Sequence, residues 1–227
     1  SRGLGDVYKR QVLITGGESG IGRAMADAFR KDGALVHVAD VDGTADQPPG
    51  GGFTAADVSD PSDVDRLFDD VMAGLGGLDV LCANVGIAGP TGPVEELEAS
   101  DWDRTMAVNV RSAFLCCRRA VPLLREAGGG SILLTASTAG ITGYPMRSPY
   151  AASKYAVVGL GQTLEQTLLS LTIWDPMDYR TFTKIIQIHV YCHLALSTGL
   201  AFAQNIVCQQ TIVLRGLMNL YTGQTSQ

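Results

Sequence analysis

The chain has 227 residues, 46% of them hydrophobic and 18% charged, which suits one globular domain with a full core. Its net charge of −6 argues against a surface that binds nucleic acid or an anionic membrane, so neither partner is expected. The five cysteines form no C-x-x-C pair, which indicates reduced thiols and a cytoplasmic protein. The uncharged stretch between Lys184 and Arg215 is interrupted by Gln and His, so no membrane-spanning helix is expected there.

Up to about Leu168 the chain alternates short apolar runs with helical patterns. Strands are expected at residues 12–15, 35–39, 53–56, 78–83 and 131–135, and helices at 21–31, 61–73, 102–127 and 149–168. Asp60 and Pro61 mark a helix start, and Pro122 is expected to kink the long third helix. Strands that alternate with helices of this length predict an α/β fold, a Rossmann-like doubly wound parallel sheet in a single domain.

A glycine-rich loop over residues 15–22 follows the first expected strand and enters the first expected helix. Gly16 allows a tight turn, Gly20 lets the backbone approach a pyrophosphate, and Gly22 lets the helix pack against the strand. The start of the helix then faces the phosphate charge. A loop of this kind can be a structural turn alone, but its strand–loop–helix context predicts a dinucleotide site. The expected contacts in the loop are Gly16, Ser19, Gly20, Ile21 and Gly22.

Asp40 ends the second expected strand, 18 positions after Gly22. A carboxylate there can accept hydrogen bonds from both hydroxyls of an adenosine ribose and repels a 2′-phosphate. No Arg or Lys lies between Gly16 and Gly22 or next to Asp40, and Glu18 adds negative charge. The sequence therefore favours NAD over NADP as the cofactor. The alternative is that Asp40 is a solvated acid at a strand end.

Several further motifs follow the loop in order. They are Asp57-Val58, Asn84-Val85-Gly86, Asn109 within M-A-V-N-V, Ser137 within S-T-A-G, and Tyr150-x-x-x-Lys154, which lies 13 residues after Ser137. With the T-G-x-x-x-G-x-G spacing of the loop, this series resembles the short-chain dehydrogenase/reductase family over about residues 12–168. Val85 departs from the usual Ala of the N-A-G segment.

The resemblance implies roles for these residues. Asp57, Val58, Asn84 and Gly86 would contact the cofactor together with Tyr150 and Lys154, and the catalytic set would be Asn109, Ser137, Tyr150 and Lys154. The resemblance further implies that Lys154 holds the nicotinamide ribose and that Asn109 supports a water-linked proton path to it. A homodimer or homotetramer built on the two long helices is also implied.

The chemistry can also be argued from the side chains themselves. Tyr150 and Lys154 share one face of a helix at i and i+4. The ordinary pKa of a phenol, about 10, is too high for a base at neutral pH, and a neighbouring ammonium favours the phenolate. Ser137 can hydrogen-bond the substrate oxygen, and Tyr150 can take the hydroxyl proton as hydride leaves for the nicotinamide. Taken singly, such residues are more often a surface pair and a turn serine.

The two ends of the chain depart from this pattern. Residues 6–11 are also the translation of GATGTGTATAAGAGACAG, which resembles the transposase-end adapter of sequencing libraries, so residues 1–11 are expected to be an adapter-derived extension. Residues 169–227 lack the Pro-Gly turn and substrate loop that the resemblance implies, so an atypical, foreign or frameshifted tail is expected. Any strand in this tail is expected at residues 185–192 or 206–214. No metal site is expected, because His189 and His193 have no acidic partner nearby.

These observations predict an NAD(P)-dependent oxidoreductase that interconverts a secondary alcohol and a ketone. Its partner would be a small-molecule alcohol or ketone, whose identity the sequence does not indicate. The alternative is a catalytically silent NAD-binding fragment of such an enzyme.

Overall fold

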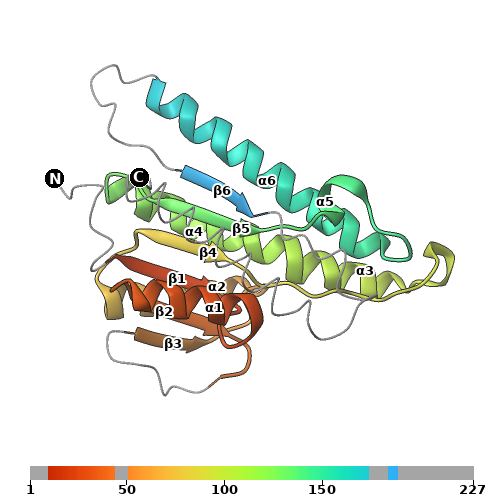
Figure 1. Cartoon of the computed structure of the whole chain (residues 1–227), viewed down its shortest axis with the longest axis horizontal. Helices are drawn as coiled ribbons and strands as arrows, with labels where there is room; N and C mark the ends of the chain where they lie inside the picture. Colours follow the sequence, from red (N-terminus) through yellow and green to blue (C-terminus); the bar gives the residue numbers. More distant parts are fainter. Residues whose placement is uncertain (1–9, 44–50, 174–183, 189–227) are drawn as a thin grey trace, which may run out of the picture.

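The computed structural model describes residues 10–43, 51–173 and 184–188, which form a six-stranded parallel sheet with helices packed against it (Figure 1). The strands are β1 (Gln11–Thr15), β2 (Leu35–Asp40), β3 (Gly51–Ala55), β4 (Val80–Ala83), β5 (Ser131–Thr135) and β6 (Lys184–Ile188). Their order in the sheet is β3-β2-β1-β4-β5-β6. The chain therefore builds outward from β1 to β3 and then reverses to β4 on the other side of β1. A crevice at such a reversal, outside the carboxyl ends of the strands, is where α/β sheets bind ligands.

The helices are α1 (Gly20–Lys31), α2 (Pro61–Leu75), α3 (Ala99–Met106), α4 (Ser112–Glu126), α5 (Ala139–Thr142) and α6 (Ser148–Ile173). A π-helical segment, Ala107–Arg111, joins α3 to α4. Asp60 caps α2 by accepting hydrogen bonds from the backbone of Ser62 and Asp63, and Pro61 occupies the first turn.

Two buried apolar clusters hold the helices against opposite faces of the sheet. Val12 and Ile14 of β1 pack with Met25 of α1, whereas Leu13 between them packs with residues of α2, α4 and α6. This alternation follows from the two-residue period of a strand. Both faces of β1 are fully buried, which explains why its sequence is apolar without a polar side.

The strands and helices expected up to residue 168 all occur, with shifted ends and one unexpected feature. The helix expected over residues 102–127 begins earlier and contains the π-helical segment, while Pro122 lies inside α4, which continues to Glu126. Gln11, which the sequence placed in an extension, belongs to β1 and pairs with Leu35. Of the strand expected at residues 185–192, residues 185–188 belong to β6, which pairs with all of β5, and residues 189–192 lie outside the described residues.

The remaining expectations for the two ends lie outside the described residues. These are the adapter-derived origin of residues 1–9, the strand at residues 206–214 and the surroundings of His189 and His193. Within the part of the chain that the structure describes, no helix has both the length and the apolar character needed to cross a membrane.

Candidate active site

A cavity of about 720 Å³ lies at the carboxyl ends of the strands. Twelve of the residues predicted from the sequence line it: Gly16, Ser19, Gly20, Ile21, Asp40, Asp57, Val58, Asn84, Gly86, Ser137, Tyr150 and Lys154. The other two, Gly22 and Asn109, are not among the lining residues. One crevice therefore joins the glycine-rich loop, the strand-end acid and the Ser–Tyr–Lys set.

The glycine-rich loop has the backbone geometry that its sequence predicts. Gly16 and Gly20 adopt φ values of +65° and +51°, where side chains are strained. A Cβ on Gly20 would meet no atom within 4 Å, so this part of the loop is open to a ligand. A Cβ on Gly22 would lie 2.0 Å from the Gly16 carbonyl oxygen, so Gly22 allows α1 to approach the loop. Asn84 Nδ2 donates to that same oxygen at 3.2 Å and holds the loop against the end of β4.

Asp40 is fixed at the end of β2. Its Oδ2 accepts a hydrogen bond from the Glu18 backbone N–H at 3.1 Å, and its Oδ1 accepts one from the Val41 N–H at 2.9 Å. A carboxylate oxygen has two lone pairs, so each oxygen keeps one for a ligand. The arrangement presents an oriented negative charge at the cavity wall.

Asp57 has a different surrounding from Asp40. Its Oδ1 accepts hydrogen bonds from the backbone N–H and the hydroxyl of Ser59, at 2.9 and 2.8 Å, and its own N–H donates to Asp63. The side chain therefore shapes the turn that leads into α2. Its predicted role as a cofactor contact stays a prediction.

Tyr150 and Lys154 lie one turn apart on α6, and Ser137 follows β5. The Lys154 ammonium lies 5.8 Å from the centroid of the Tyr150 ring and donates to the Thr135 carbonyl oxygen at 2.9 Å. Lys154 is only 4% exposed, and this burial lowers its pKa from the ordinary value of 10.5 to about 8. Ser137 accepts a hydrogen bond from the Ala139 N–H at 3.2 Å, which leaves its hydroxyl hydrogen available to a ligand.

Asn109 lies in the π-helical segment, behind the cavity wall. Its Oδ1 accepts from the Ile87 N–H at 2.7 Å, and its Nδ2 donates to the Ile87 carbonyl at 2.9 Å and to Ser153 Oγ at 2.9 Å. Ser153 is fully buried and donates to the Tyr150 carbonyl at 2.7 Å. The Asn109 amide thus ties a cavity-lining loop to the helix that carries Tyr150 and Lys154. Its predicted part in a proton path stays a prediction.

The family model for short chain dehydrogenases matches residues 10–173. The chain belongs to this family. It is 39% identical over 166 residues to the 3beta-hydroxysteroid dehydrogenase of Mediterraneibacter gnavus, covering 69% of this chain and 60% of that protein. It is 35% identical over 162 residues to the levodione reductase of Leifsonia aquatica, covering 66% and 61%. The chain therefore spans about three fifths of the length of these relatives.

A solved structure of another protein supports the same fold. The 3-ketoacyl-(acyl-carrier-protein) reductase from Brucella melitensis, complexed with NADH, superposes with a TM-score of 0.74 at 28% identity. The match covers 82% of this chain and 76% of that one. The predicted Rossmann-like fold is confirmed.

Some residues that shape the site were not predicted from the sequence. Thr15 Oγ1 accepts from the Asn84 N–H at 3.1 Å, and Thr135 supplies the carbonyl that holds Lys154. Ser153 could have been found, because it directly precedes Lys154 in the motif. Arg104 also lines the cavity, together with Ala107 and Val108 at the i+3 and i+4 positions of the same helical face.

Proposed function

We propose that this chain carries the catalytic domain of an NAD-dependent oxidoreductase that interconverts a secondary alcohol and a ketone. The observation that supports this most directly is that Ser137, Tyr150 and Lys154 line the same cavity as the glycine-rich loop and Asp40. The open backbone at Gly20 and the N-terminus of α1 suit a pyrophosphate, so the residues present fit a dinucleotide. When bound, the nicotinamide would supply the site that accepts or donates hydride.

The proposed roles of the side chains follow from their contacts. Ser137 donates its free hydroxyl hydrogen to the substrate oxygen and holds that oxygen beside Tyr150. Tyr150 takes the hydroxyl proton during oxidation and returns it during reduction. Lys154, with its pKa lowered to about 8 by burial, exchanges a proton near neutral pH more readily than an exposed lysine. Its position beside the Tyr150 ring places its positive charge where a phenolate would form.

We infer NAD rather than NADP because Asp40 would face the 2′-phosphate of NADP. Glu18 of the glycine-rich loop, whose N–H donates to Asp40, adds a second acidic residue near this position. The NADH in the Brucella melitensis reductase supports a nicotinamide cofactor. The ratio of the dissociation constants for NADPH and NADH tests this preference. Asp40→Asn is expected to bring the two constants closer together. Asp42→Asn is the matched control, because Asp42 is exposed and is not among the lining residues. Equal or tighter binding of NADPH by the unaltered chain contradicts the inference.

The proposed function is tested by titrating NADH through its fluorescence beside a turnover assay on secondary alcohols and ketones. Turnover with a nicotinamide cofactor is the expected result. NADH binding without turnover on any member of the panel would instead support the silent NAD-binding fragment.

Two further proposals concern the oligomeric state of the chain and the cellular compartment in which it works. Two large aromatic side chains, Phe114 on α4 and Tyr155 on α6, are 49% and 47% exposed. Their exposure supports a homodimer or homotetramer built on these helices. Light scattering would measure the mass of the assembly. Cys82 and Cys117 are free and buried, and burial raises the pKa of each thiol to about 12. Unpaired thiols are typical of a reducing compartment, so we propose that the chain is cytoplasmic.

A further inference from the structure

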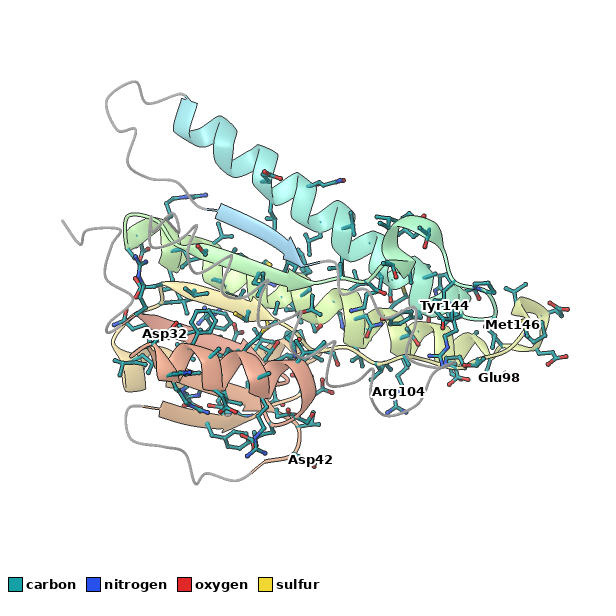
Figure 2. The ribbon with its side chains drawn as sticks, viewed as in Figure 1. Asp32, Asp42, Glu98, Arg104, Tyr144 and Met146 are labelled. Carbon is teal, nitrogen blue, oxygen red and sulfur yellow. The ribbon has the colours of Figure 1, made fainter. Side chains whose placement is uncertain are left out.

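Arg104 is an exposed residue of α3, labelled in Figure 2. It is one of the residues that line the cavity. Ala107 and Val108 line the cavity from the same helical face. An arginine on this face has a long, flexible side chain whose planar guanidinium can bind two oxygens of a phosphate at once.

The other charged residues of the cavity wall each have a partner within the protein. Asp40 and Asp57 accept hydrogen bonds from their own turns, and Lys154 donates to the Thr135 carbonyl in a buried position. Within residues 10–43, 51–173 and 184–188, the Arg104 guanidinium forms no hydrogen bond or ion pair. It is the cation of the described cavity wall that remains available to a ligand.

The dinucleotide of the proposed function brings a charge that the glycine-rich loop does not balance. A pyrophosphate carries two negative charges, whereas residues 16–22 contain no Lys or Arg and include Glu18. Arg23 follows in the first turn of α1 but is not among the residues that line the cavity. The N-terminus of α1 supplies only about half a positive charge. The acidic side chains of Asp40 and Asp57 make the cavity wall still more negative. The Arg104 guanidinium, which lines the same cavity, would offset this negative charge.

We propose that Arg104 is a binding residue for the pyrophosphate of the dinucleotide, which it contacts from α3 across the cavity. The proposal rests on the dinucleotide-binding half of the proposed function and does not depend on turnover. It assigns the affinity for the phosphates to two elements: the backbone at the start of α1 and the side chain of Arg104.

The test measures NADH and ADP affinity for four proteins at low and high salt: the unaltered chain, Arg104→Gln, Arg104→Lys and Arg125→Gln. Arg125 is the matched control, since it is exposed at the end of α4 and is not among the lining residues. At low salt, Arg104→Gln is expected to weaken the binding of both ligands about three- to five-fold, as for loss of a partly exposed charge pair. High salt should remove most of this difference. Arg104→Lys should keep much of the affinity, and Arg125→Gln all of it.

Four results overturn the proposal. They are an Arg104→Gln affinity within two-fold of the control, a loss that salt does not reduce, a loss for NADH without one for ADP, and an unaltered chain that binds neither ligand. Failure of the proposed function looks different. In that case the unaltered chain binds NADH without turning over any substrate, and the comparison of Arg104 with Arg125 remains decisive.

Discussion

The buried charge of Lys154 is expected to lower the free energy of unfolding of the chain. Burial lowers its pKa from 10.5 to about 8, and each pKa unit corresponds to about 1.4 kcal/mol, so the buried charge costs about 3 kcal/mol at neutral pH. Lys154→Met removes that cost but also removes the hydrogen bond to the Thr135 carbonyl, which contributes about 1 kcal/mol. The variant should therefore be more stable than the unaltered chain by about 2 kcal/mol at pH 7.

The dependence on pH separates this cause from simple repacking. Below about pH 8 Lys154 is charged in both the folded and the unfolded chain, so the full cost applies. Between about pH 8 and 10.5 the folded chain has lost a proton that the unfolded chain keeps, so stability rises with pH. Urea unfolding of both proteins from pH 7 to 10 should show the unaltered chain gaining about 2.5 kcal/mol relative to Lys154→Met. Parallel curves for the two proteins would refute the reasoning.

Three further substitutions test other parts of the structure by urea unfolding. Met146 has a φ of 62°, a conformation that strains a residue with a side chain, and it is 52% exposed. Met146→Gly should therefore raise the free energy of unfolding by about 0.5–1 kcal/mol. A lower free energy of unfolding would show that the backbone at Met146 is not strained. Gly22→Ala should lower the free energy of unfolding by about 1–3 kcal/mol and weaken NADH binding at least about ten-fold, because the added Cβ would clash with the Gly16 carbonyl. Gly74→Ala in α2, where a Cβ meets no atom, should raise the free energy of unfolding. The same change in stability for both variants would contradict the close packing at Gly22. Ser153→Ala leaves a buried amide donor unpaired and should cost about 1–3 kcal/mol, more than Ser148→Ala, whose hydroxyl has no partner among the described residues.

The order and type of the elements could be predicted because each carries a local signal. The apolar run of β1 and the Asp60–Pro61 start of α2 both act through neighbouring residues, so the sequence alone indicates them. The π-helical segment could not be predicted in this way. It places Asn109 where its amide binds Ile87 and Ser153, and these contacts join segments that are 22 and 44 residues apart.

The candidate site was predictable to the extent that spacing within one element determines it. The i and i+4 relation places Tyr150 beside Lys154, and the strand–loop–helix context opens Gly20 to a ligand. The burial of Lys154 and the charge left free on Arg104 depend on which segments surround them. Such surroundings arise from tertiary packing, which no local pattern in the sequence records.

The most direct test of the proposed function compares Tyr150→Phe with Tyr155→Phe in a nicotinamide turnover assay. Tyr155 is exposed on the same helix and is not among the lining residues. Tyr155→Phe keeps the ring that the proposed helix interface would bury, so this variant controls for the loss of a hydroxyl from α6. Tyr150→Phe keeps the ring and removes only the group that transfers the proton. We expect turnover to fall about 10²–10⁴-fold while NADH binding is unchanged, with Tyr155→Phe behaving like the unaltered chain. Near-normal turnover of Tyr150→Phe would show that the proton is transferred elsewhere.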